Sequence, residues 1–214
     1  MKVIGVITIV DYGVGNVQAL LNLFDYLGIE AGTSKDPDAI LNARKLVLPG
    51  VGSFDKAMLE LNARGLIAPL EKAVLHQRVP VLGICLGMQL FARKSAEGSA
   101  QGLGWIAADV QRIEPPIGSN LKVPHVGWSE VDPKYQSPLF PVNAERERFY
   151  FVHGYHVVCD YTSDILATVD YGQPLCCAVH RDNIWGVQFH PEKSHRFGMR
   201  LLTAFADLPL HGSK

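Results

Sequence analysis

The sequence predicts an α/β protein with a doubly wound, mostly parallel sheet that has helices on both faces. Short, continuous apolar runs alternate with helical patterns over about the first hundred residues. After Gly104 the pattern changes to runs that alternate apolar and polar residues, which is typical of antiparallel additions to a sheet. The chain of 214 residues contains no repeat, low-complexity tract or clear linker, so we expect residues 1–214 to form one domain.

The parallel part of the sheet is expected from three short runs that are rich in Val, Ile and Leu. Such runs are typical of strands that are buried on both faces. They are Val3–Val10, Lys45–Pro49 and Val79–Ile84.

Helical patterns separate these strands. The first spans Val17–Leu27, where Asn16 is the expected N-cap and Gly28 the expected stop. Ser53 is the expected N-cap of a second helix, and a further pattern covers residues 66–77. Helices between parallel strands imply right-handed crossovers.

The second half is expected to add antiparallel strands and one closing helix. Period-two runs cover Phe149–Val158, Leu175–His180 and Ile184–His190, with a turn at residues 181–183 between the last two. An amphipathic pattern over about His195–Ala206 predicts the final helix.

Composition excludes several classes of function. The 20 Lys and Arg residues nearly balance the 21 Asp and Glu residues, which argues against a surface for nucleic acid or for an anionic membrane. The first apolar stretch is closed by Asp11 and is too short for a signal or a membrane span. Four scattered cysteines without a CxxC pair fit a reducing compartment, so we expect a cytoplasmic protein.

The stretch Gly83-Ile84-Cys85-Leu86-Gly87 has the form of a nucleophile elbow, at the point where a strand passes into a helix. Glycines make room for the tight turn, and the free N–H groups after the turn favour a thiolate. The alternative is a small buried thiol that closes a strand, which is the commoner role of a single cysteine.

A base for this thiol is expected at His190, in the sequence His190-Pro191-Glu192 at the end of a strand. In an extended segment, residues i and i+2 project to the same side, so Glu192 can orient the imidazole. Taken alone, a histidine at a strand end is more often an ordinary polar group.

A third candidate element is the turn Gly50-Val51-Gly52, which follows a strand and precedes the helix expected at Ser53. Glycines allow a close approach of the backbone to a ligand, although an ordinary turn has the same composition. In a doubly wound sheet the ends of these strands meet at one edge, where such folds bind ligands. We therefore expect Cys85, His190 and this turn to converge.

Two other kinds of site are not supported. The dinucleotide pattern suggested by Gly13-Val14-Gly15 lacks its third glycine, because position 18 is Gln18. His125, His153 and His156 lie in separate segments without a carboxylate cluster, so we expect structural roles and no metal.

Together the stretches PGVGSF, GICLGMQ and GVQFHPEKS resemble those of the class I glutamine amidotransferases. With DYGVGN, VPHVGW and FYFVH, nearly the whole chain resembles the glutaminase subunits of imidazole glycerol phosphate synthase. The resemblance implies a three-layer, flavodoxin-like fold. It also implies that Cys85 attacks the side-chain amide of glutamine, that His190 transfers protons and that Glu192 orients His190.

The resemblance further implies the surroundings of the substrate. N–H groups of the turn Gly50, Val51 and Gly52 and of Leu86 would surround the oxyanion, and no cofactor or metal is implied. Contacts to glutamine would come from Gln89, Glu97, Tyr150 and His153. The ammonia would pass to a cyclase (β/α) barrel in a heterodimer that makes imidazole glycerol phosphate and AICAR for histidine biosynthesis.

Other readings stay open at this stage. The same elbow serves cysteine peptidases and other acyl hydrolases, and the fold can also form a catalytically dead binding subunit. Ser129, Gly154 and the SHRFGM stretch at residues 194–199 depart from the histidine-pathway pattern. They resemble a paralogous branch that supplies ammonia to a sugar-amidating or sugar-amidinating partner in surface-polysaccharide biosynthesis.

Overall fold

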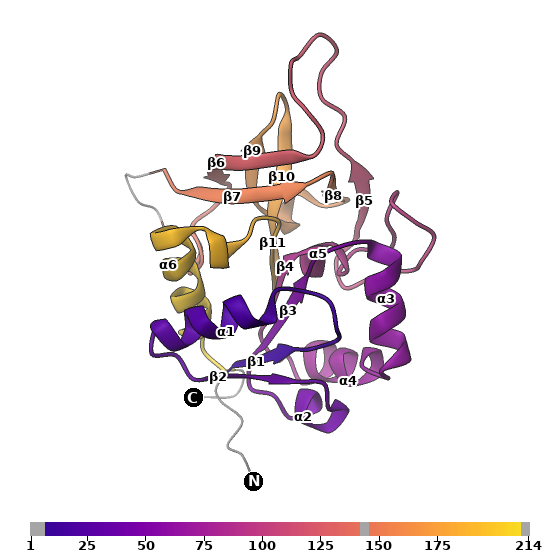
Figure 1. Cartoon of the computed structure of the whole chain (residues 1–214), viewed down its shortest axis with the longest axis vertical. Helices are drawn as coiled ribbons and strands as arrows, with labels where there is room; N and C mark the ends of the chain where they lie inside the picture. Colours follow the sequence, from indigo (N-terminus) through magenta and orange to yellow (C-terminus); the bar gives the residue numbers. More distant parts are fainter. Residues whose placement is uncertain (1–6, 142–145, 211–214) are drawn as a thin grey trace.

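The computed structural model describes residues 7–141 and 146–210, which form a mixed sheet with helices packed on its faces (Figure 1). The strand order is β2-β1-β3-β4-β11-β10-β9-β6-β7, and β8 pairs with both β10 and β5. The strands β2, β1, β3, β4 and β11 are parallel, and this confirms the predicted fold class. Their bounds are β1 (Ile7–Val10), β2 (Ala31–Ser34), β3 (Leu46–Gly50), β4 (Val81–Cys85) and β11 (Ile184–Val187).

The antiparallel part is larger than the sequence analysis expects, and it forms the upper half of the molecule in Figure 1. The expected single run over residues 149–158 is divided at Gly154 into two strands. The first pairs with β6, whereas the second pairs with β5 and β10. These strands are β5 (Ala108–Arg112), β6 (His125–Pro133), β7 (Arg148–His153), β8 (Tyr155–Cys159), β9 (Ile165–Asp170) and β10 (Pro174–Arg181).

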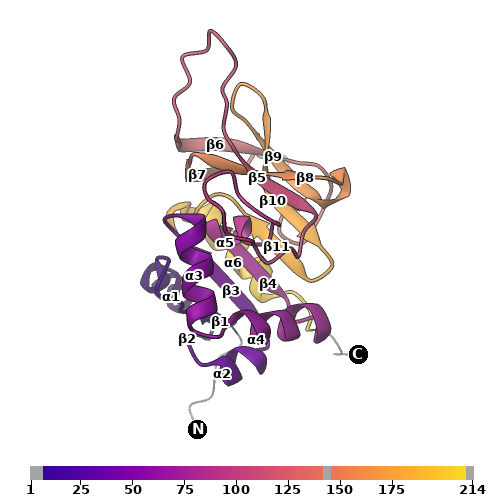
Figure 2. The same ribbon diagram turned by 90° about the vertical axis from the view of Figure 1, so that its right-hand side faces the viewer.

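Helices cover both faces of the parallel strands (Figures 1 and 2). Alternate residues of β3 point to opposite faces, so Leu46 and Leu48 belong to one core cluster and Val47 to the other. The first cluster includes α2 (Pro37–Leu41), α3 (Phe54–Ala63), and α4 (Ile67–Glu71) with the π-helical turn η1 (Lys72–His76). The second includes α1 (Val17–Tyr26) and α6 (His195–Ala206).

The expected element boundaries hold in most places. The side chain of Asn16 caps α1 by accepting the N–H of Ala19 at 3.4 Å, and Gly28 follows the helix with φ of +67°. Ser53 precedes α3 but makes no capping hydrogen bond with its side chain, which corrects the expected cap. For the first strand, residues 7–10 match the prediction, and residues 3–6 lie outside the described part of the chain.

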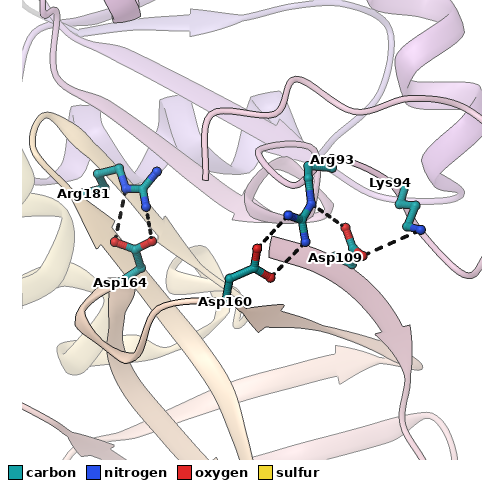
Figure 3. Close-up of polar contacts among 6 residues, drawn as sticks. All are labelled: Arg93, Lys94, Asp109, Asp160, Asp164 and Arg181. Atoms are coloured by element: carbon teal, nitrogen blue, oxygen red, sulfur yellow. Dashed lines mark hydrogen bonds and ion pairs between the residues drawn. The ribbon is translucent and has the colours of Figure 1, made fainter. Parts of the chain in front are cut away.

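Two groups of ion pairs lie in and beside the antiparallel part (Figure 3). Arg93 lies between Asp109 and Asp160, with N–O distances of 2.8 and 2.6 Å, and these side chains are 28–45% exposed. Arg181 instead binds Asp164, with its two N–O distances at 3.2 and 2.6 Å. The side chain of Asp164 is only 7% exposed, so this pair is the more deeply buried of the two groups.

We predict that Asp164→Ala lowers the free energy of unfolding by about 1–3 kcal/mol, because it removes two charge-assisted hydrogen bonds from a buried position. Asp160→Ala serves as the matched control and should change stability little, because its ion pair is exposed to solvent. Urea unfolding at constant slope measures both values. Equal losses in the two variants would contradict the distinction.

Candidate active site

Cys85 is the last residue of β4 and immediately precedes the short helix α5 (Leu86–Gln89). Its backbone has φ of 54° and ψ of −111°, a conformation that residues other than glycine rarely adopt. The residue is 7% exposed, and its side chain reaches a cavity at the edge of the sheet. The expected strand-to-helix elbow is therefore present.

Close packing around this elbow requires glycine. A Cβ atom at Gly87 would lie 1.9 Å from the carbonyl oxygen of Leu48, and a Cβ atom at Gly50 would lie 2.7 Å from the amide nitrogen of Gly87. The elbow therefore packs directly on the backbone of β3. Tyr12, which the sequence analysis did not identify, donates its hydroxyl to Pro49 O at 2.6 Å and so fixes the start of the glycine turn.

His190 and Glu192 form the expected pair. Nδ1 of His190 lies 2.8 Å from Oε1 of Glu192, and both side chains are 3% exposed. The pair does not arise from the expected extended segment, because Glu192 lies in the 3₁₀ turn η3 (Pro191–Lys193). The main chain of His190 is held on both sides, since its N–H donates to Tyr150 O and its carbonyl accepts from the Ser194 hydroxyl.

The environment of His190 favours its charged form. Burial lowers the pKa of His190, but interactions with Cys85 and Glu192 outweigh burial and raise the pKa to about 9. Within the described residues, Nε2 of His190 is buried and has no hydrogen-bond partner, and the ring lines the same cavity as Cys85. The raised pKa keeps the ring of His190 charged near neutral pH, as an imidazolium.

The three expected elements meet at one edge of the sheet. Gly50 at the end of β3 is paired with Cys85 at the end of β4, and on the other side β4 is paired with β11, which leads to His190. A cavity of about 290 Å³ opens there. Its lining residues are Val51, Gly52, Cys85, Leu86, Gln89, Glu97, Pro124, Val152, His153, Gly154, Tyr155 and His190.

Two of the expected substrate contacts lie outside this lining. Gly50 packs behind the cavity against Gly87, and the ring of Tyr150 lies near Trp128 and Lys193. Tyr150 and Val152 lie on the same outer face of β7, and the carbonyl of Tyr150 accepts the N–H of His190. Tyr150 therefore supports the candidate base and does not line the cavity.

Glu97 lines the cavity and also holds the loop that carries it. Its Oε2 accepts the N–H of Phe54 at 2.8 Å, which supplies the helix cap that Ser53 does not provide. Asp55, one residue further on, accepts the N–H groups of Ser99 and Ala100 and so ties the same loop to α3.

Gln188 is a candidate site residue that the sequence analysis did not identify. It is fully buried and donates Nε2–H to Sγ of Cys85 at 3.6 Å, while its Oε1 accepts from Gln89 at 2.9 Å. A lone polar residue between Val187 and Phe189 in an apolar strand was the available signal. A donor at this position stabilises negative charge on the sulfur.

Two further observations concern the described part of the chain. It contains no group of three or more His, Cys, Asp or Glu side chains arranged to hold a metal ion. No helix within it has the length and apolar character needed to cross a membrane.

Comparison with known proteins places this geometry in context. Residues 8–207 match the family model described as glutamine amidotransferase class-I. The chain is 46% identical, over 94% of its length and 99% of the relative, to "Imidazole glycerol phosphate synthase subunit HisH 2" of Pseudomonas aeruginosa. A similarly named subunit HisH 2 of Methanococcus maripaludis is also 46% identical, over 93% of this chain and 98% of the relative. Subunit HisH of Bdellovibrio bacteriovorus is 45% identical, over 94% of this chain and 100% of the relative.

Solved structures share the fold at low sequence identity. A crystal structure titled as a glutamine amidotransferase superposes with a TM-score of 0.70 at 19% identity, covering 94% of this chain and 97% of the other. The structure of PurLQS from Thermotoga maritima gives 0.67 at 16% identity, covering 93% and 96%.

We predict that Glu192→Gln lowers the pKa of His190 from about 9 toward 6.5, because a neutral amide no longer stabilises the imidazolium. The proton should therefore leave His190 at lower pH in the variant. Titration of the ring by NMR measures the change, with the exposed Glu60→Gln as a control. An unaltered His190 pKa in Glu192→Gln would refute the electrostatic role.

Proposed function

Because the chain belongs to the class I glutamine amidotransferases, we propose that it is the glutaminase subunit of an imidazole glycerol phosphate synthase. Glutamine is hydrolysed to glutamate and ammonia, and the ammonia serves histidine biosynthesis. The observation that supports this function best is that Cys85 and His190 line one cavity and that Glu192 is hydrogen-bonded to His190, since a thiol, a base and an orienting carboxylate are the parts of an acyl-transfer site.

The reaction follows from these positions. Sγ of Cys85 attacks the side-chain carbonyl carbon of glutamine, and the C=O electron pair moves to the oxygen. When the C–N bond breaks, the imidazolium of His190 gives its proton to the leaving nitrogen and ammonia departs. Neutral His190 then takes a proton from water, which attacks the thioester; the C–S bond breaks, and glutamate and the thiolate of Cys85 are released.

The surrounding residues have separate tasks in this proposal. Backbone N–H groups of Val51 and Leu86 stabilise the oxyanion, and the flanking Gly50 and Gly52 allow the turn to approach the substrate. Gln89, Glu97 and His153 contact glutamine from the cavity wall. Glu192 keeps Nδ1 of His190 protonated and holds the ring in place.

The partner in this proposal is a cyclase (β/α) barrel that forms a heterodimer with this chain. Exposed apolar side chains lie on the glycine turn and on the outer face of the β6–β7 ribbon, and two of them, Val51 and Val152, line the cavity. They are Val51, Val126, Trp128 and Val152. Covering them with a partner would shield the ammonia from solvent. The four free cysteines fit a cytoplasmic complex.

We predict that Cys85→Ala abolishes glutamine-dependent synthesis by the complex and leaves synthesis from added ammonium salt intact. The thiol takes part only in the production of ammonia. Both reactions are measured on the purified complex, with Cys159→Ala as a control for loss of a thiol elsewhere. Glutamine consumption by Cys85→Ala at a rate comparable to the unmodified chain would exclude this nucleophile.

A second candidate partner is an enzyme that amidates or amidinates a sugar in surface-polysaccharide biosynthesis. Three departures favour it, namely Ser129, Gly154 and the stretch at residues 194–199. Two relatives are named subunit HisH 2, and the numeral distinguishes that subunit from another one called HisH. The glutaminase site would be unchanged, because only the acceptor of ammonia differs.

Complementation separates these partners. We expect the gene to restore growth without histidine to a strain that lacks its own glutaminase subunit, because the chain should dock on the cyclase barrel. Cys85→Ala in the same strain is the control and should not support growth. Failure to complement, together with activation of glutaminase by a sugar-modifying enzyme and not by the cyclase, would establish the second partner.

A further inference from the structure

A continuous series of hydrogen bonds runs from the β6–β7 ribbon to the wall of the cavity. Nε2 of His125 lies 2.9 Å from the hydroxyl of Ser129, and Nδ1 of His125 lies 3.1 Å from Nε2 of His153. Nδ1 of His153 lies 2.8 Å from the carbonyl oxygen of Tyr155. Both histidines are buried, and the strand pairing places Ser129, His125 and His153 on the inner face of the ribbon.

The direction of each hydrogen bond follows from its last acceptor. The carbonyl of Tyr155 only accepts, so Nδ1 of His153 must carry the hydrogen. In a neutral ring Nε2 of His153 then accepts from Nδ1–H of His125, and Nε2 of His125 accepts from the hydroxyl of Ser129. Burial keeps both rings neutral, because it lowers the pKa of His125 to about 4 and that of His153 to about 3.

The same carbonyl connects this series to the nucleophile. Tyr155 O also accepts Nε2–H of Gln89 at 3.1 Å. Gln89 in turn donates to Gln188, which donates to Sγ of Cys85. Tyr155 and Gln89 both line the cavity, so the donors on this carbonyl affect the shape of the pocket.

We propose that Ser129 is a positioning residue for the glutamine pocket, because its hydroxyl donates to Nε2 of His125 in the Nδ1–H form that the carbonyl of Tyr155 imposes, and so holds both rings and that carbonyl in place. This inference rests on the proposed glutaminase function. Ser129 touches no lining residue of the cavity directly among its described hydrogen bonds and acts through the two rings.

Removing the hydroxyl leaves two unfavourable arrangements. If the tautomers stay as they are, Nε2 of His125 becomes an acceptor without a protein donor. If the rings reverse their polarity, Nδ1 of His153 becomes an acceptor that faces the carbonyl of Tyr155 at 2.8 Å, and the two repel. In the first case His125 loses the contact that holds it against His153, and in the second the carbonyl of Tyr155 and Gln89 lose their fixed position directly.

The test compares Ser129→Ala with Ser129→Thr, which retains a hydroxyl, and with the exposed Ser119→Ala as a control, all in the full chain with its partner. We expect Ser129→Ala to raise the KM for glutamine about tenfold with a smaller change in kcat, because binding depends on the pocket wall. Ser129→Thr should restore the KM, and Ser119→Ala should match the unmodified chain.

The second readout is the tautomer of each ring, measured by ¹⁵N NMR on the full chain and assigned with His125→Gln and His153→Gln. We expect Nδ1–H for both rings in the unmodified chain and a mixed population in Ser129→Ala. An Nε2–H form of either ring in the unmodified chain, or unchanged KM and tautomers in Ser129→Ala, would overturn the proposal. Absence of glutamine hydrolysis in the unmodified chain would refute the proposed function instead, and the tautomers would still decide the role of Ser129.

Discussion

The strained backbone of Cys85 is the constraint on which the rest of the site depends. A positive φ at a residue with a side chain costs on the order of 1–3 kcal/mol, so it persists only where the surroundings enforce it. Here β4 is hydrogen-bonded on both sides, and Gly87 packs against the carbonyl of Leu48. The parallel sheet thus supplies the stability that holds the sulfur at the edge, beside the glycine turn and His190.

The buried histidines around the cavity differ in the direction in which their pKa values are shifted. His190 has a carboxylate and a thiol beside it, and its pKa is raised, whereas His125 and His153 have only neutral neighbours in hydrogen-bond contact and their pKa values are lowered. Burial acts on all three in the same direction, so the partner decides the outcome. Neutral rings next to the site do not repel the imidazolium of the proposed reaction.

Local pattern and fold topology were enough to predict the parallel strands, the principal helices and the convergence of Cys85, His190 and the glycine turn. These features depend on hydrophobic periodicity and on the shared edge of parallel strands. Long-range contacts were beyond that reasoning. Glu97 caps α3 in place of Ser53, and Gln188 donates to Cys85; both contacts join residues far apart in the chain. The division of the expected strand at Gly154 depends on which strands pair with each half.

The tight glycine packing at the elbow also determines how this molecule can diversify. Side chains cannot be added at Gly50 or Gly87 without separating β3 from the elbow, so the residues of the elbow and its neighbouring turn cannot vary at these positions. The outer face of the β6–β7 ribbon has no such restriction, since Val126 and Trp128 are exposed to solvent. If the proposed partner docks on this face, evolution can exchange the recipient of the ammonia by altering a solvent-facing surface, while the site that makes the ammonia is inherited unchanged.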